Sequence, residues 1–370
     1  MMQTRTMMNM LIAVSALFLL TGPVQAWNEF DGDTDDNFAV AANWEGDHLP
    51  VGTSTLDIAD IGSSGLSPAS VFLDTVLPGS IGGLHVGIGG YDGTLEIRNG
   101  GTLSVATYYC RVGRDADSTG KVDILDGGSL LVLNSKVTDF ADKAGGSGIV
   151  NVWGTFNSTG RVNVGLYGDA ELNVFGSGDV DADELYLAYG YTDGSPTGLL
   201  TLTDDATVDT VGKLEAGTWD LGAGTDWTIR ITDDLGDDPS LHVGGSAVFY
   251  KDGLYQPQIS GDNIDFAITG SLSLNAQAAG PSILTIEPLA LSGLASGDYT
   301  VMTYASLTNN GSIVMNDTDA SGTWTIKEVG ATELVLTYAE TAEIPEPGTL
   351  LLLGTGALGV IGYLKRKRMK

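Results

Sequence analysis

Short runs of alternating apolar and polar residues dominate this chain, and most are bounded by Gly, Asn or Asp. A period of two places the apolar side chains on one face of a strand, and the turn residues between runs mark the corners. Outside the two ends of the chain, no segment has the spacing of an amphipathic helix. The pattern therefore predicts an all-β protein made of many short strands.

One of these patterns is repeated within residues 82–217. The copies follow the form Gly/Ala-x-Leu/Val-x-Ile/Val/Leu, and in the first two a Gly-Gly-x-Leu-x-Val phrase follows. The copies, which weaken along the chain and are 27, 28, 22 and 28 residues apart, begin at Gly93, Gly120, Gly148, Ala170 and Gly198. A second register, Leu-x-Val-Gly or a close variant, precedes several copies by a few residues. Repeats of this length indicate a stacked architecture.

A unit of this size cannot bury its apolar face alone, whereas stacked copies bury a continuous column and pair each strand with its neighbours. We therefore expect residues 82–217 to form a right-handed parallel β-helix, or β-solenoid. Residues 27–81 would cap its N-terminal end, because solenoids need capped ends. An antiparallel sandwich with accidental periodicity is the alternative.

After about residue 218 the repeat fades and longer strand candidates follow, separated by turns. For residues 218–342 the sequence predicts a β-sandwich-like C-terminal region or a broad β-cap that closes the solenoid. It does not choose between the two.

The N-terminal end has the composition of a targeting segment. Residues 1–26 carry Arg5 as their single charge, continue through an apolar run, and finish with small residues. This order predicts a secretory signal peptide cleaved between Ala26 and Trp27. The apolar run is too short to span a bilayer unaided, although a short anchor is the alternative.

The C-terminal end, residues 343–370, has three parts in sequence. The motif Pro345-Glu346-Pro347 precedes an uncharged stretch from 349 to 364, and a basic cluster follows, formed by Lys365, Arg366, Lys367 and Arg368. The stretch is at the short end for a transmembrane helix. Basic residues stay cytoplasmic under the positive-inside rule, so the body would lie outside. A plain membrane anchor is one interpretation.

In its order of motif, apolar helix and basic cluster, this tail resembles the PEP-CTERM family. The resemblance implies a transient inner-membrane anchor recognised by exosortase, a membrane-embedded cysteine transpeptidase of Gram-negative bacteria that make extracellular polysaccharide. Pro345, Glu346 and Pro347 would be the recognition motif, and the protein would reach the cell surface or extracellular space. Separately, the repeat phrases resemble β-helical passenger-type repeats of secreted bacterial proteins, which bring no catalytic residues with them.

The charge of the mature body, residues 27–343, narrows the choice of partners. It contains 11 basic and 46 acidic residues, a formal charge of −35. Phosphate backbones need the opposite sign, so nucleic acid is excluded as a partner. Neutral glycans and divalent cations remain, and the single cysteine, Cys110, cannot form an intramolecular disulfide.

Calcium is the one cofactor with support from the sequence. Two clusters place acids at alternate positions: Asp31, Asp33 and Asp35, and then Asp179, Asp181 and Asp183. Oxygen-rich clusters suit hard cations. The first resembles the start of an EF-hand loop, but Asp36 and Ala42 replace the required Gly and Glu. A solvated acidic loop is the alternative, and no other cofactor is expected.

No catalytic motif stands out. The three histidines are far apart in the sequence, and no metal-ligand spacing or nucleophile elbow is present. We therefore expect a non-enzymatic, structural or adhesive protein of an exopolysaccharide or biofilm matrix. The alternative is a secreted polysaccharide lyase or hydrolase, which would need convergent Asp or Lys residues in a groove.

Overall fold

The computed structural model describes residues 27–32, 35–45, 47–51, 58–63, 70–190, 195–217, 226–232, 239–259, 265–275, 282–290, 294–309, 311–317, 322–329 and 332–340. The predicted signal peptide (1–26) and sorting tail (343–370), including its expected transmembrane helix, lie outside these residues. Within them, 28 strands and one short 3-10 helix, Ala41–Asn43, account for the regular structure. The prediction of an all-β protein is confirmed.

Two sheets contain these strands. The larger, 17-stranded sheet consists of β1 (Trp27–Glu29), β2 (Ile58–Ile61), β4 (Gly83–Val86), β6 (Thr102–Val105), β7 (Cys110–Val112), β9 (Ser129–Val132), β10 (Thr138–Phe140), β12 (Thr155–Val164), β14 (Asp179–Leu187), β16 (Thr207–Thr210), β17 (Leu214–Ala216), β19 (Ser240–Val243), β20 (Ala247–Tyr250), β22 (Asp265–Asn275), β25 (Gly297–Asn309), β27 (Gly322–Val329) and β28 (Glu333–Glu340). The 11-stranded sheet consists of β3 (Ser70–Leu73), β5 (Gly93–Ile97), β8 (Thr119–Ile124), β11 (Ser147–Val152), β13 (Asp169–Val174), β15 (Thr197–Thr203), β18 (Asp226–Thr232), β21 (Gly253–Ile259), β23 (Ile283–Ile286), β24 (Leu289–Ala290) and β26 (Ser312–Met315).

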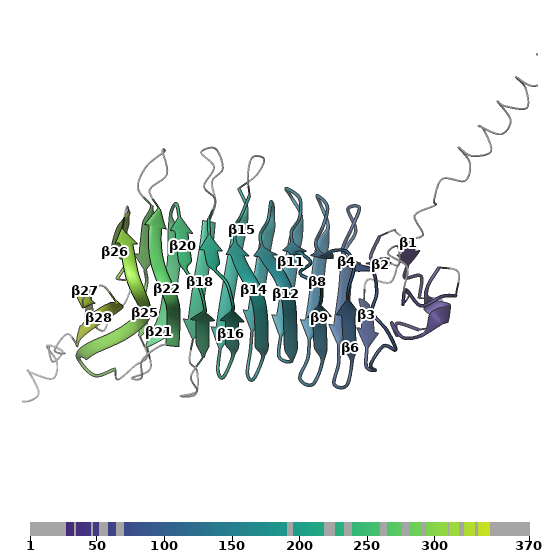
Figure 1. The fold of residues 1–370 in the computed structure, drawn as a ribbon, viewed down its shortest axis with the longest axis horizontal. Helices are drawn as coiled ribbons and strands as arrows, with labels where there is room; N and C mark the ends of the chain where they lie inside the picture. Colours follow the sequence, from purple (N-terminus) through teal and green to yellow (C-terminus); the bar gives the residue numbers. More distant parts are fainter. Residues whose placement is uncertain are drawn as a thin grey trace, which may run out of the picture.

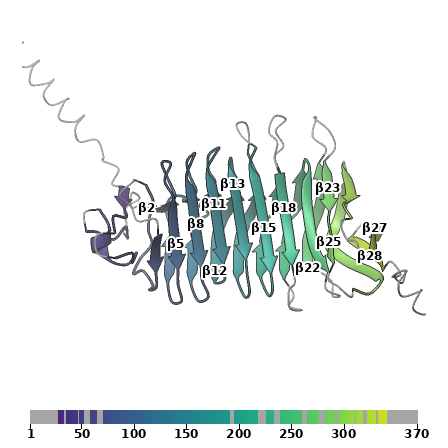
Figure 2. The same cartoon turned by 180° about the vertical axis from the view of Figure 1, so that it is seen from behind.

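The chain coils through both sheets in repeated circuits, here called rungs. A typical rung runs through β8 in the 11-stranded sheet and then through β9 and β10 in the 17-stranded sheet. In β12, β14 and β22 the last two segments join into one long strand. The described residues build about nine rungs, stacked into an elongated body whose two faces appear in Figures 1 and 2. Neighbouring rungs pair in parallel, so the predicted parallel β-solenoid is confirmed.

The strand register aligns the repeats found in the sequence. Gly93 pairs with Gly120, Gly120 with Gly148, Gly148 with Ala170, and Ala170 with Gly198. The short offset of 22 residues falls in the rung of β11 and β12, where the two segments of the larger sheet merge and shorten the circuit.

The expected β-sandwich-like region in 218–342 is wrong, because the solenoid continues. Strands β18, β21, β23 and β26 extend the 11-stranded sheet in parallel, each paired with the one before it. A cap is present only as the antiparallel hairpin of β27 and β28, in which β28 also pairs with β25. This hairpin reverses the strand direction and closes the C-terminal end of the stack.

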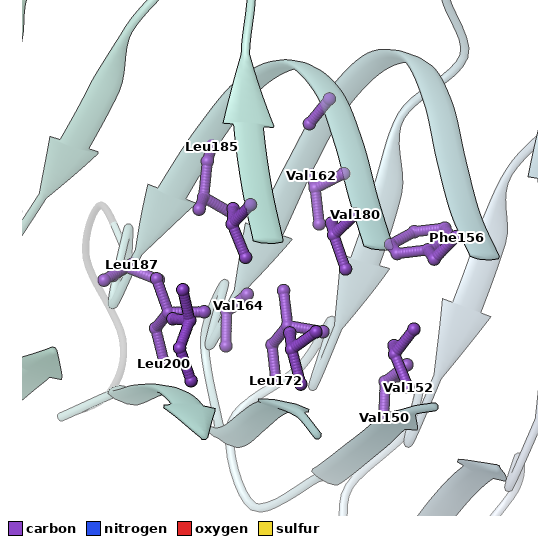
Figure 3. Packing of buried hydrophobic residues seen from close by; sticks show 14 of the residues in the cluster. Val150, Val152, Phe156, Val162, Val164, Leu172, Val180, Leu185, Leu187 and Leu200 are labelled. Carbon is purple, nitrogen blue, oxygen red and sulfur yellow. The ribbon is translucent and has the colours of Figure 1, made fainter. Parts of the chain in front are cut away.

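The core is a column of aliphatic side chains inside the coil, to which each strand contributes alternate residues (Figure 3). In the rung of β11 and β12, for example, Val150, Val152 and Val162 point inward and are buried. Burying apolar surface in this way contributes roughly 25 cal/mol per Å².

Aromatic side chains close the column at both ends. At the N-terminal end, Trp44 makes edge-to-face contacts with Phe30 and Phe38, with ring centroids 5.1 and 4.7 Å away. At the other end, Trp324 packs 4.7 Å from the ring of Tyr338. Large rings cover the exposed end of an aliphatic column more completely than small side chains do.

Across the described ranges, no helix is long and apolar enough to cross a membrane.

Candidate ligand-binding site

The first predicted acidic cluster lies in the N-terminal cap. Asp33 is outside the described residues. Asp35 is used within its own loop, since its Oδ1 accepts hydrogen bonds from Asn43 Nδ2 at 2.6 Å and from the Asn37 backbone N–H at 2.9 Å. Asp31 has a buried oxygen, Oδ1, without a hydrogen-bond partner in the described part of the chain. Calcium binding at this cluster stays a prediction.

The second predicted cluster gains a member from the next rung. Asp179 and Asp181 lie on β14, and β16 runs beside it in the register that pairs Asp181 with Asp209. Ligand oxygens of Asp179, Asp181 and Asp209 all lie within 4.8 Å of one another, and we call these residues the carboxylate trio. Asp183 is not a member. Sequence analysis missed Asp209, although the 28-residue repeat aligns it with Asp181.

Neighbouring polar groups shape the charge of the trio. Asn157 Nδ2 donates to Asp181 at 3.2 Å, while His242 contacts Asp209 at 3.1 Å and Asp265 at 2.7 Å. Partial burial and the nearby Asp179 and Asp209 raise the pKa of Asp181. Burial lowers the pKa of His242, but Asp265 and Asp209 outweigh it, so that this pKa is raised. Three close carboxylates match the donor set that Ca²⁺ prefers.

A second polar group lies on the other segment of the 17-stranded sheet, and sequence analysis did not single it out. In each of seven consecutive strands, from β2 to β17, one residue on the side of the sheet away from the aliphatic column aligns with the next, and all but Arg111 are buried. We call this row the polar strip: Asp60, His85, Arg111, Asp139, Asn163, Tyr186 and Glu215. Stacking alone brings these residues together, since neighbours are 22 to 29 residues apart in the sequence.

A column of residues two positions before those of the strip flanks it, within β12 and β14 and just ahead of β7 and β17. It includes Tyr109, Arg161, Glu184 and Lys213, and Arg161 pairs in register with Glu184. The guanidinium of Arg161 lies 5.1 Å from the centre of the Tyr186 ring, and Lys213 Nζ lies 4.9 Å from it. Cations near an aromatic face are attracted by the ring quadrupole.

Ion pairs and hydrogen bonds link the strip along its length. Arg111 Nε is 3.2 Å from Asp142, and the Arg111 guanidinium lies 4.2 Å from the Tyr109 ring centre. Asn163 Nδ2 donates to Asp139 at 2.6 Å, and Lys213 Nζ contacts Glu215 at 2.7 Å. Side chains of the strip are therefore already paired with one another or with close neighbours.

Burial changes the acidity of this region. Asp139 is only 4% exposed, and its burial, together with the charge of Asp142, raises its pKa to about 6. The hydrogen bond from Asn163 and the charges of Arg111 and Arg161 lower this pKa, but they do not offset the effect of burial. Burial lowers the pKa of Lys213, but its contacts with Glu215 and Tyr186 outweigh this effect and raise it. Burial also raises the pKa of the Cys110 thiol to about 12, so this core residue is unreactive.

Comparison with known families concerns the tail of the chain. Residues 343–367 match the family described as PEP-CTERM protein-sorting motif, as the resemblance predicted. This chain carries a PEP-CTERM sorting signal. The match includes Pro345, Glu346, Pro347 and the basic residues up to Lys367, whereas Arg368 lies just beyond it. A search of curated proteins gives no match.

The PEP-CTERM signal implies that the protein is exported, processed at the membrane and recognised by exosortase. Cleavage between Ala26 and Trp27 stays a prediction. The described body of this PEP-CTERM protein places four of its 11 basic residues in or beside the polar strip, namely Arg111, Arg114, Arg161 and Lys213. In a body of formal charge −35, this concentration of basic residues distinguishes the strip from the rest of the chain.

Proposed function

We propose that this protein is a structural or adhesive component of an exopolysaccharide or biofilm matrix, delivered to the cell surface by exosortase. The sorting motif at residues 343–367 is the observation that carries this proposal. A stack of about nine rungs supports it, since solenoids present long surfaces suited to extended partners. The exopolysaccharide is the proposed partner.

Intact mass of the protein released from its native host tests the proposal. In the host we expect a chain that starts at Trp27 and has lost the residues after the Pro345-Glu346-Pro347 region. A strain without exosortase should retain the tail, and so should the variant Glu346→Ala in the normal strain. The control Glu340→Ala, on β28, should be processed normally. A full-length tail in both strains would contradict sorting and remove the main support for a matrix role.

A polysaccharide-active enzyme is the second candidate, and one observation favours it. Asp139 has a pKa of about 6 and lies between two arginines of neighbouring rungs, and a perturbed carboxyl beside cations is typical of acid–base sites. A reducing-sugar assay on neutral and acidic polysaccharides decides the matter. Release of reducing ends that Asp139→Asn abolishes would replace the non-enzymatic proposal.

A further inference from the structure

We infer that an open cavity on the outer face of the 11-stranded sheet binds a cationic amino-sugar unit of an exopolysaccharide. The inference rests on the proposed matrix function and gives it a site and a ligand class. The cavity has a volume of about 350 Å³ and lies over β18, β21 and β23, towards the C-terminal end of the stack (Figure 2). This volume is at the small end of the range for ligand pockets, so it suits a short segment of a polymer.

The cavity is open to solvent. Its base is formed by Thr228, Leu254 and Thr285, which align in register on three successive strands and are all partly exposed. At its rim, the side chains of Asp226 and Asp252 are exposed. A ligand can therefore reach every one of these groups from outside.

The charge of the lining favours a cation. It contains three carboxylates, those of Asp226, Asp252 and Glu287, and no basic side chain. Asp226 and Asp252 lie side by side, because each comes one residue before the paired Trp227 and Gly253. Neither carboxylate forms an ion pair with a residue that the structure describes. A positively charged ligand would neutralise these groups, whereas an anionic polysaccharide would be repelled.

Earlier rungs of the same face provide a contrast, because their acids already have cationic neighbours. Asp123 pairs with Lys121 Nζ at 2.7 Å and also accepts a hydrogen bond from Asn151 Nδ2 at 2.7 Å. Glu96 forms an ion pair with Arg98. Uncompensated negative charge on this face is therefore greater at the cavity than in these rungs.

Hydrogen bonds from neighbouring rungs hold Glu287 in place. Gln256 Nε2 donates to Glu287 Oε1 at 3.4 Å, and Asn316 Nδ2 donates to Oε2 at 2.7 Å. Gln256 is itself fixed by Arg230, whose Nη2 and Nε donate to its Oε1 at 2.7 and 2.9 Å. A carboxylate accepts about four hydrogen bonds, so Glu287 keeps acceptor positions for a ligand. Because these groups are ordered beforehand, less entropy is lost on binding.

The spread of the carboxylates favours an organic ligand over a metal ion. In the described part of the chain, only the carboxylate trio brings three such ligand oxygens within 4.8 Å of one another, so those of the cavity do not converge. An amino sugar carries an ammonium group for one carboxylate, and hydroxyl groups for the other carboxylates and the threonines. Leu254 offers apolar surface to the C–H face of the sugar ring.

Isothermal titration calorimetry of the protein released from its host tests this inference. The probes are glucosamine oligosaccharides of one defined length and their N-acetylated counterparts, which have the same linkage but no charge. The buffer is mildly acidic, so that the amines are protonated, and has an ionic strength of about 0.15 M, which screens long-range attraction to the acidic body. We expect the glucosamine form to bind at least tenfold more tightly than the acetylated form.

Variants of the lining locate the site. Asp226→Asn and Glu287→Gln should each weaken binding several-fold, and the double variant should weaken it at least tenfold, because each removes a charge that faces the ligand. Asp226 is exposed at the start of β18, so its replacement protects the test against misfolding of a Glu287 variant. Circular dichroism should show that all variants are folded.

Glu171→Gln is the matched control. Glu171 is exposed on the same face outside the cavity and also accepts a hydrogen bond from an asparagine, Asn173 Nδ2, at 3.2 Å. The control removes one negative charge, as each single variant does, and should bind like the wild type. Unspecific attraction to the acidic body would instead affect all three single variants equally.

Equal binding by the wild type and the folded cavity variants would overturn the site. Equal binding of the acetylated oligosaccharides would overturn the ligand class, and so would equally tight binding of spermidine that the same variants weaken. Absence of binding by every probe would overturn the inference, while the intact-mass experiment judges the matrix proposal separately.

Discussion

Asp139 occupies an environment that favours its protonated form. Its pKa of about 6 in the folded protein lies above the ordinary value of 3.8. Below pH 4 the Asp139 carboxyl is protonated in both the folded and the unfolded chain. As pH rises towards 6, the carboxyl loses its proton first in the unfolded chain. The free energy of unfolding should therefore fall by about 3 kcal/mol across this window.

The variant Asp139→Asn should remove this loss, so its melting temperature should rise relative to the wild type between pH 4 and pH 7. Thermal denaturation at several pH values measures the difference. Asp115→Asn provides a control of opposite sign: burial raises the Asp115 pKa, but the contacts with Lys143 and the Gly89 N–H outweigh it and lower the pKa. A constant difference for Asp139→Asn across the pH range would contradict the prediction.

Gly113 illustrates why the Leu-x-Val-Gly phrase ends in glycine. Its φ is +68°, and a Cβ atom there would lie 1.8 Å from the Ser147 carbonyl oxygen of the next rung. Gly87 and Gly165, at the same corner of other rungs, also have positive φ. Gly113→Ala should therefore lower the free energy of unfolding by at least about 2 kcal/mol, because strain and a backbone clash add up.

Chemical denaturation measures this loss against the control Gly79→Ala. A Cβ at Gly79 meets no atom within 4 Å, so the control should stay within about 0.5 kcal/mol of the wild type. Equal stability of the two variants would mean that the corner relaxes freely.

The hairpin of β27 and β28 is the element that ends the solenoid. Trp324 of β27 packs against Tyr338 and Tyr299, and it covers the last rung. Trp324→Ala should cost about 3 kcal/mol in denaturation and increase self-association in light scattering, because it exposes a sheet end. Trp153→Ala, which removes a ring stacked on Phe175 at a surface corner, should cost less than half as much. Similar losses in both variants would deny the hairpin a special capping role.

The strands of the first rungs could be predicted because glycine marks the same corner in each. In the later rungs, Trp227 and Leu284 stand at the position that begins each copy of the repeat. The distances between successive aligned residues there become 29, 26 and 31 residues. A fixed period no longer reveals the coil, and this is why a sandwich was expected. The antiparallel hairpin has no signal that separates it from a rung strand.

Sequence reasoning found part of the candidate sites. Asp179 and Asp181 were predicted because they are close in the chain, whereas Asp209 and the polar strip depend on register. Residues such as Arg111 and Asn163 look like ordinary polar positions of an alternating strand, and only the alignment of rungs shows them as one row.

At the scale of the whole molecule, a charge of −35 favours the binding of cations at the points of highest negative density. If calcium binds the carboxylate trio with a Kd near 1 mM, 10 mM calcium should add about 1.4 kcal/mol to the free energy of unfolding. The melting temperature should rise accordingly, and Asp209→Asn should abolish the rise. Asp183→Asn, outside the trio, should retain it. Isothermal titration without heat in millimolar calcium would remove the calcium prediction.

The two ends of the described chain lie at opposite ends of the stack (Figure 1), and strand pairing joins consecutive rungs. Folding can therefore proceed vectorially during translocation, as the chain emerges from its N-terminal side. The aromatic cluster of Phe30, Phe38 and Trp44 would form first and serve as a template for each arriving rung. Completed rungs would oppose backward sliding of the chain, so the N-terminal rungs would be in place before the C-terminal hairpin emerges.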